Sequence, residues 1–216
     1  PDGNGIPHTS AIVHGKVGLS EGCAAFDLSL GCSGFVYGLN VLHSFMSAQQ
    51  FDYGVIITCD PYSKIIDPGD KNTTLLFGDA ATATLLRSSG STAKGWRIGP
   101  SLFGTSGARG RALHNDEAKL AMDGRAVFNF SATVVPEQLK ALLERSAVTI
   151  DEIDFFIFHQ GSKFIVDTLR KRMGLPTEKV VLSLADVGNT VSSSIPLALE
   201  KYLDQVEARR IVLSGF

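Results

Sequence analysis

The chain has 216 residues, of which 44% are hydrophobic and 19% are charged, a composition typical of a globular protein. Its 20 basic and 22 acidic residues leave a net charge of −2, which argues against a nucleic acid or an anionic membrane surface as the partner. The three cysteines, at positions 23, 32 and 59, lack the spacing of a metal site and cannot all pair in disulfides, so they favour a reducing, cytoplasmic environment.

The first part of the chain predicts a helix near residues 8–17, a strand at residues 24–30 and a helix from Ser33 to about residue 48. The stretch from residue 28 to residue 51 contains no charged side chain and is long enough to span a bilayer. Its serines, its glycines and its strand-like start favour a helix of the protein core instead.

The next part of the chain is expected to alternate between strands and loops. Residues 53–59 read as an apolar, buried strand, and residues 60–72 as a loop rich in Pro, Asp and Gly. Two further strands are predicted at residues 73–77 and 80–86. Residues 87–115 show little periodicity and are expected to connect two halves of the protein.

The C-terminal part predicts alternating helices and strands. A helix from Asp123 to about residue 147 contains Pro136, which we expect to break or kink it. A second helix begins after the capping residue Ser162 and ends near Gly174. Strands are predicted at residues 154–158, 180–184 and 210–214, and a further helix at residues 191–203.

Two segments of the chain share one pattern. An apolar strand, a turn, a helix of small residues and another apolar strand follow one another around Cys32 and again around Asn189. This repetition predicts an α/β protein with two related halves, residues 1–90 and 91–216, whose apolar strands are buried on both faces. If the two halves face each other, Cys32 and Asn189 meet at the pseudo-twofold axis.

Cys32 is the first residue whose position suggests chemistry. It lies where a strand-like run meets a helix-like run, so its sulfur is expected at a helix N-terminus. Unpaired N–H groups and the helix dipole favour an anion there, and a thiol with a lowered pKa can act as a nucleophile. The competing interpretation is a small buried hydrophobic residue, as most free cysteines are.

Two polar residues follow apolar runs in the C-terminal half. His159 is expected at the carboxyl end of the strand at residues 154–158, where α/β proteins place functional groups. Asn189 lies between a predicted strand and a predicted helix; it is either an ordinary turn or capping residue or a donor toward a developing oxyanion. Of the other histidines, His43 is expected to be hydrogen-bonded in the core.

Four motifs, in this order, resemble one known family. They are residues 27–35 (DLSLGCSGF), 67–80 (DPGDKNTTLLFGDA), 158–162 (FHQGS) and 188–190 (GNT). Over essentially its whole length the chain is similar to the β-ketoacyl-acyl carrier protein synthase III family of the thiolase superfamily.

The resemblance implies an α/β, thiolase-like fold. Two related βαβαβ-type halves would form layers in the order αβαβα. The N-terminal half would be incomplete in residues 1–90, and the last strand of the second half would be truncated at its C-terminal end.

The resemblance also implies an active site formed by Cys32, His159 and Asn189. Cys32 would take an acyl group from acyl-CoA as a thioester. His159 and Asn189 would stabilise the enolate formed when malonyl-acyl carrier protein loses CO2, and this carbon would attack acyl-Cys32 in a Claisen condensation. The product would be a 3-oxoacyl-acyl carrier protein, the first step of fatty-acid synthesis. No metal and no other cofactor would be required, and the protein would form a homodimer.

Further residues correspond to family positions with other roles. Contacts with pantetheine or CoA are implied for Met122, Gly124, Phe128, Gly161, Ser162 and Lys71. Lys163, Lys171 and Arg172 correspond to a surface that docks the carrier protein, although Lys171 and Arg172 could instead complement the helix dipole and solvate the surface. Ile6 corresponds to a residue that reaches the acyl pocket of the partner subunit.

Some positions differ from the family pattern. Ser162 replaces a common Asn, Lys71 an Arg, and Phe164 a basic residue. The differences at Lys71 and Ser162 favour, as an alternative, an acyl-Cys transferase of specialised biosynthesis that passes its acyl group to another acceptor.

The two ends of the chain suggest a further alternative. The chain begins with Pro1 and ends within a strand-like run, before the Gly-rich strand that supplies an oxyanion-hole N–H in the family. It is therefore expected to be a piece of a longer protein, and the piece could be catalytically silent.

Overall fold

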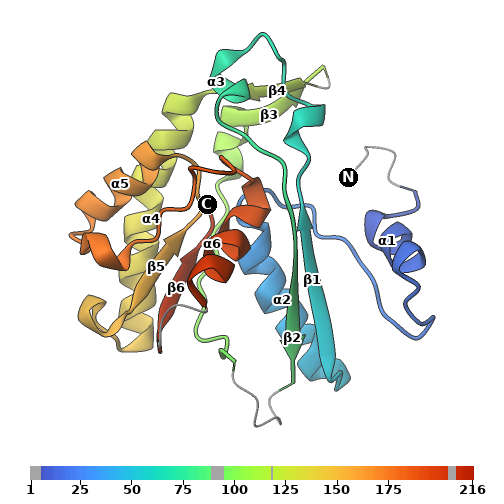
Figure 1. Cartoon of the computed structure of the whole chain (residues 1–216). Coiled ribbons are helices and arrows are strands. Elements are labelled where there is room, and N and C mark those ends of the chain that lie inside the picture. Colours follow the sequence, from blue (N-terminus) through green and yellow to red (C-terminus); the bar gives the residue numbers. More distant parts are fainter. Residues whose placement is uncertain (1–5, 89–94, 118, 204–207) are drawn as a thin grey trace.

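The computed structural model describes residues 6–88, 95–117, 119–203 and 208–216 (Figure 1). Its helices are α1 (Thr9–Val17), α2 (Gly34–Gln49), α3 (Lys71–Thr74), α4 (Gly124–Ser146), α5 (Lys163–Arg172) and α6 (Ser194–Leu203). Its strands are β1 (Tyr53–Cys59), β2 (Ala81–Arg87), β3 (Leu113–Asp116), β4 (Lys119–Met122), β5 (Phe155–Phe158) and β6 (Ile211–Ser214).

The parallel pair β5–β6 lies at the centre of the C-terminal part, with helices on both of its faces (Figure 1). Because side chains alternate along a strand, Phe156 and Phe158 point to one face, where they pack with residues of α4 and α5. Ile157 points to the other face and packs against Phe35 of α2 and Ile195 of α6. A strand that is apolar at every position is therefore buried on both sides, as the sequence predicts.

The antiparallel pair β1–β2 lies on the far side of α2 (Figure 1). Ile56 of β1 contacts the same core cluster as Phe35 and Ile157, so α2 and α6 separate this hairpin from β5–β6. Helix α2 buries one face, with Phe35, Gly38 and Met46, whereas Val41 and His43 are exposed. The expected core helix is therefore found for that face only, and the expected burial of His43 is wrong. No helix in the described part of the chain is both long and apolar enough to cross a membrane.

Strand β1 was expected to be buried, and this expectation is wrong for one of its faces. Val55 and Ile57 are 54% and 53% exposed, and Tyr53 and Leu85 lie exposed on the same face of the hairpin. The opposite face packs on α2, where a Cβ on Gly54 would lie 2.6 Å from the sulfur of Met46. The hairpin therefore has the one-sided burial of an antiparallel sheet rather than that of a central parallel strand.

Three predicted strands are absent from the described structure. Residues 24–30 form no strand; the Asp27 carboxylate instead accepts hydrogen bonds from the backbone N–H groups of Thr9 and Ser10 at the start of α1. Residues 73–77 begin within α3, because the Asp70 side chain caps that helix.

The third missing strand, at residues 180–184, is reduced to a single bridge between Phe156 and Val180. The side chain of Gln160 takes the place of the remaining ladder. Its amide donates to the carbonyls of Phe158 and Val181, and its oxygen accepts from the N–H of Ser183. A buried polar side chain with all of these partners satisfies the backbone without a strand.

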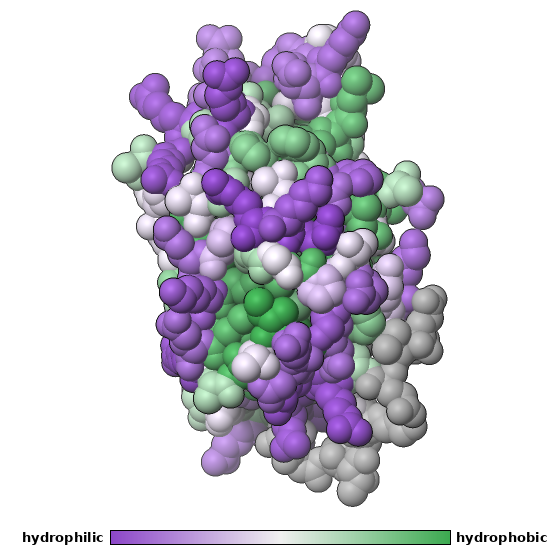
Figure 2. All heavy atoms as spheres, turned by 90° about the vertical axis from the view of Figure 1, so that its left-hand side faces the viewer, coloured by the Kyte–Doolittle hydropathy of each residue, from purple (hydrophilic) through white to green (hydrophobic). Residues whose placement is uncertain are grey.

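The outer side of α4 is only partly covered. Figure 2, which views the molecule from the side of α4 and α5, shows an apolar hollow surrounded by polar side chains. A groove of about 440 Å³ on this helix is lined by Pro136, Leu139, Lys140, Leu143, Glu144, Ala147, Val148, Thr149, Ile150, Arg172 and Met173.

Of the break or kink predicted at Pro136, the break does not occur, since the helix runs without interruption from Gly124 to Ser146. Proline has no N–H, so it leaves the carbonyl of the residue four positions earlier, Ala132, without its helical partner. The Arg172 guanidinium at the end of α5 donates a hydrogen bond to this carbonyl. Arg172 thus compensates for the proline and connects two helices.

We predict that Arg172→Ala lowers the free energy of unfolding by about 1–2 kcal/mol, because the buried Ala132 carbonyl loses its donor. Lys171→Ala, at the exposed neighbouring position, is the matched control and should change stability by less than about 0.5 kcal/mol. In a Pro136→Ala background, where an N–H again faces Ala132, the loss caused by Arg172→Ala should shrink. Equal losses in both backgrounds, measured by urea unfolding, would contradict this role.

Candidate active site

Cys32, His159 and Asn189 lie on three separate elements that meet around one short segment, residues 189–194. Cys32 directly precedes the N-cap of α2, and His159 directly follows β5. A Cβ on Gly31 would lie 3.8 Å from Val191, and His159 bonds to Ser194. Residues beside Cys32 and beside Asn189 are therefore close together, and the meeting of Cys32 and Asn189 themselves at a pseudo-twofold axis stays a prediction.

Cys32 occupies a half-buried turn at the start of α2. Its carbonyl oxygen lies against Gly215, where an added Cβ would approach it to 2.9 Å, so glycine is required there. Burial raises the pKa of the thiol from 9.0 to about 12, and the negative charge of the Asp60 carboxylate is the second cause of this shift. The expected position at a helix start is confirmed, but the expected lowering of its pKa is wrong, because desolvation and a nearby negative charge dominate.

His159 is almost fully buried at the carboxyl end of β5. Its Nδ1 lies 2.7 Å from the hydroxyl of Ser194, and its ring meets the Phe216 ring edge to face with centroids 5.5 Å apart. Burial lowers the pKa of His159 to about 4, although a backbone hydrogen bond with Val191 opposes this shift. The imidazole is therefore neutral at physiological pH and can donate one hydrogen bond without carrying charge.

The segment after α3 binds both the backbone N–H and the backbone carbonyl of Asn189. The Asn189 N–H donates to the carbonyl of Leu76 at 2.9 Å, and its own carbonyl accepts from the N–H of Gly78 at 3.0 Å. A Cβ on Gly78 would lie 2.1 Å from the carbonyl oxygen of Val187, so only glycine fits this crossing. The side-chain oxygen of Asn189 accepts from the N–H of Val191, which leaves its amide NH2 as a donor.

The turn after Asn189 has a strained backbone. Val191 is fully buried and has φ +54°, a conformation that a β-branched residue rarely adopts. Such strain persists only where the surroundings impose it, and it is frequent at functional sites. Here the hydrogen bond from Val191 to the Asn189 side chain and three serines that follow hold the turn.

These three serines each bind a different part of the protein. Ser192 donates its N–H and its hydroxyl to the carboxylate of Asp60, which follows β1. Ser193 shares a 2.7 Å hydrogen bond with Thr58 of β1, and Ser194 bonds to His159. One short segment therefore links the hairpin, the Cys32 turn and the end of β5.

The residues expected to contact pantetheine or CoA are only partly grouped. Gly161 lies against the His159 ring, since an added Cβ would be 3.4 Å from its Nε2, and Ser162 caps α5 through its hydroxyl. Phe128 of α4 stacks on the exposed Phe164 of α5, with ring centroids 5.0 Å apart. Met122 ends β4, and Gly124 is the first residue of α4, the helix that also carries Phe128.

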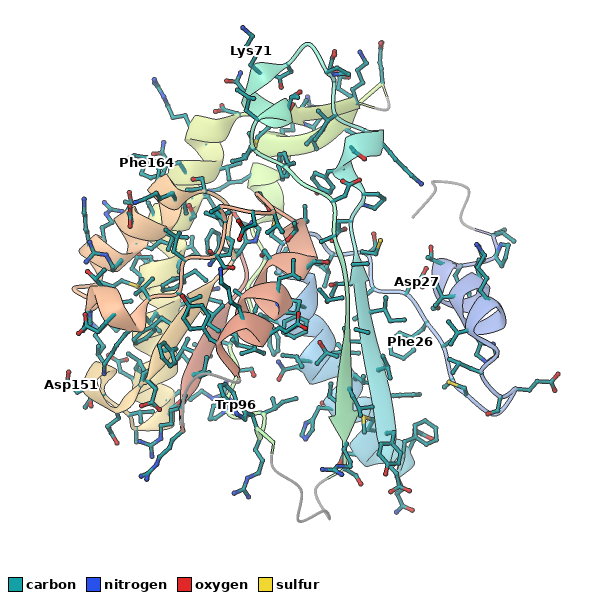
Figure 3. All side chains as sticks on the ribbon, viewed as in Figure 1. Phe26, Asp27, Lys71, Trp96, Asp151 and Phe164 are labelled. Carbon is teal, nitrogen blue, oxygen red and sulfur yellow. The ribbon has the colours of Figure 1, made fainter. Side chains whose placement is uncertain are left out.

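Other predicted site residues lie apart from this centre. Figure 3 shows Lys71 on α3 pointing away from the body of the molecule, and Ile6 is 90% exposed beside α1. In the predicted docking surface, Lys163 forms an ion pair with Asp167, Arg172 bonds to Ala132, and Lys171 is exposed. The roles of these residues stay predictions.

Sequence reasoning missed Asp60 and the serines at positions 192–194. Two signals could have revealed them: an acidic residue directly after an apolar strand, and a run of hydroxyl residues directly after the Gly-Asn-Thr motif. Within the described ranges, no group of three or more His, Cys, Asp or Glu side chains is arranged to hold a metal ion, and all three cysteines are free.

Comparisons with known proteins identify relatives over nearly the whole chain. Residues 26–107 match the family described as 3-oxoacyl-[acyl-carrier-protein (ACP)] synthase III, and residues 143–216 match its C-terminal part. A beta-ketoacyl-[acyl-carrier-protein] synthase III of Lactococcus lactis subsp. cremoris (strain MG1363) is 33% identical over 230 residues, which cover 98% of this chain and 70% of that protein.

Solved structures agree with these matches. A crystal structure of a 3-oxoacyl-(acyl-carrier-protein) synthase III has a TM-score of 0.91 and 32% identity, and the match covers 100% of this chain and 72% of that one. The corresponding synthase from Thermus thermophilus has a TM-score of 0.89 and 31% identity, with 100% of this chain and 70% of that one covered.

We predict that the free energy of unfolding rises with pH between about pH 4 and 6.5. In this range the unfolded histidine binds a proton that the buried His159 does not, so stability is lost as the pH falls. In His159→Gln, the change in the free energy of unfolding across this pH range should be smaller by about 3 kcal/mol. His114→Gln, which changes an exposed imidazole, is the matched control, and an unchanged slope in His159→Gln would contradict a neutral buried His159.

Proposed function

The chain belongs to the 3-oxoacyl-[acyl-carrier-protein] synthase III family of condensing acyltransferases with an α/β thiolase-like fold, and on this premise we propose that Cys32, His159 and Asn189 carry out its reaction. The observation that carries the proposal is the convergence of these residues on segment 189–194, with a neutral imidazole and a free amide donor. The proposed substrates are an acyl-CoA and a malonyl-acyl carrier protein.

In the first proposed step, the Cys32 sulfur attacks the thioester carbon of acyl-CoA. A bond forms between Sγ and the acyl carbon, the bond from that carbon to the CoA sulfur breaks, and the thiol proton leaves with CoA. Because the pKa of the free thiol is about 12, Cys32 is protonated before substrate binds, and it must lose this proton during attack. The helix start then stabilises the developing thiolate.

In the second proposed step, His159 and the amide NH2 of Asn189 donate hydrogen bonds to the carbonyl oxygen of the malonyl thioester. Loss of CO2 leaves an enolate on this oxygen, and preorganised neutral donors stabilise that charge in a site of low dielectric. If Ser194 donates to Nδ1, the imidazole proton lies on Nε2 and can reach the substrate. The enolate carbon attacks acyl-Cys32, the C–S bond breaks, and the released thiolate takes up a proton.

One observation favours a second candidate function. The surface expected to dock the carrier protein carries an exposed Phe164 in place of a basic residue, and Lys163 and Arg172 already have partners within the protein. An acceptor other than malonyl-acyl carrier protein would then receive the acyl group from Cys32. The homodimer, the cytoplasmic location, the absence of a cofactor and the boundary at residue 90 are kept as predictions.

Incubation with an acyl-CoA should add the mass of one acyl group to the intact protein. The exposed thiols of Cys23 and Cys59 can react non-specifically, so the adduct must be mapped to a residue, and the proposal places it on Cys32. Cys32→Ala should lose the adduct, whereas Cys23→Ala should retain it. An adduct that persists in Cys32→Ala would contradict the proposal.

The two steps should separate in a second variant. Asn189→Asp keeps the oxygen that accepts from Val191 but replaces the donating NH2 with an oxygen, so the turn is retained and the donor is lost. We expect Cys32 to acylate at a similar rate, while decarboxylation of malonyl-acyl carrier protein falls by about 10²–10³-fold. Undiminished release of CO2 would rule out Asn189 as an enolate donor.

A further inference from the structure

The Asp60 carboxylate connects the two halves of the site. Asp60 follows β1, and one of its carboxylate oxygens, Oδ2, accepts hydrogen bonds from both the N–H and the hydroxyl of Ser192. The N–H bond is 3.1 Å long and joins residues that are 132 positions apart in the sequence. A half-buried carboxylate that receives two donors from one residue fixes both the position and the orientation of that residue.

Ser192 in turn determines where the Cys32 turn can lie. A Cβ on Gly34, at the first position of α2, would lie 3.3 Å from the Cβ of Ser192, which is close contact. On the other side of Cys32, Gly31 faces Val191 and the hydroxyl of Tyr62, each 3.8 Å from an added Cβ. The segment that Asp60 anchors therefore packs against both sides of the Cys32 turn.

Through Ser192, Asp60 also brings a carboxylate close to the Cys32 turn. Helix α2, residues 189–194 and residues 214–216 contribute no charged side chain, and the buried His159 is neutral. Tyr62, a second titratable group on this side, packs against Phe77 with ring centroids 4.9 Å apart and ring planes tilted by 39°. Burial, then the charges of Cys32 and Asp60, raise the pKa of Tyr62, so the phenol is uncharged.

We propose that Asp60 is a positioning residue that ties the Cys32 turn to segment 189–194 and places a negative charge beside the Cys32 thiol. The same group thus performs two tasks: its hydrogen bonds to Ser192 set the geometry, and its charge opposes thiolate formation in the free protein. Reactivity toward oxidants and other electrophiles is thereby suppressed, because the thiolate is the nucleophile. The proposal rests on Cys32 as the reactive thiol of the proposed function.

Alkylation of Cys32 by iodoacetamide, followed by mass spectrometry over a range of pH, tests this proposal without any acyl substrate. A Cys23→Ala, Cys59→Ala background removes the two exposed thiols. In this background Asp60→Asn keeps the shape of the side chain and removes its charge. We expect the alkylation rate at pH 8 to rise about tenfold or more, since lowering the thiol pKa by one unit raises the thiolate fraction tenfold.

Two further variants separate charge from geometry. Ser192→Ala keeps the Asp60 charge but removes one donor, so it should not accelerate alkylation. Asp79→Asn is the matched control, because Asp79 also accepts from the N–H and hydroxyl of one serine, Ser63, through its two oxygens, but is not among the groups that shift the Cys32 pKa. It should leave the rate unchanged.

An Asp60→Asn variant that retains its circular dichroism but reacts at the original rate would overturn the proposal, as would equal acceleration in Ser192→Ala. If Asp60→Asn fails to fold, Asp60→Glu, which keeps the charge, decides: the proposal requires the slow rate to persist. None of these outcomes depends on acyl transfer, so failure of the proposed condensation reaction would remain distinguishable.

Discussion

The strained turn from Asn189 to Ser194 is the constraint on which the rest of the site depends. Val191 adopts a left-handed backbone conformation, and the Asn189 side chain, Asp60, Thr58 and His159 each hold one successive residue of the turn. Because these partners come from elements far apart in the sequence, the turn can form only when the layers are assembled. A strained segment with so many partners positions the site at the cost of local conformational freedom.

Burial has opposite consequences for the two titratable residues of the site, yet it leaves both neutral. It raises the pKa of Cys32, which keeps the thiol protonated, and it lowers the pKa of His159, which keeps the imidazole uncharged. A neutral site suits a reaction in which negative charge appears only transiently, first on sulfur and then on the enolate oxygen. Donors that are already oriented can stabilise each charge as it develops.

The sequence predicted best where the signal is local. The periodicity of residues 33–48 correctly predicts α2. Ser162 and Gly174 mark the two ends of α5, and the apolar run before His159 places this histidine at the end of a strand. Strands were wrongly expected at residues 24–30, 73–77 and 180–184. The Asp70 cap starts a helix before residue 73, and the Gln160 side chain replaces strand pairing near residue 183. Strand propensity alone cannot reveal such contacts. The pKa of Cys32 was predicted with the wrong sign, because the distant Asp60 and the overall burial are tertiary properties.

The most direct test of the account is carbon–carbon bond formation by the protein itself. The chain is mixed with an acyl-CoA and 13C-labelled malonyl-acyl carrier protein, and the carrier protein is analysed by mass spectrometry. When all three malonyl carbons are labelled, the carrier protein should carry a 3-oxoacyl group that contains two labelled carbons, and this product should depend on Cys32. Acylation of Cys32 without this product, or the same product from Cys32→Ala, would contradict the account.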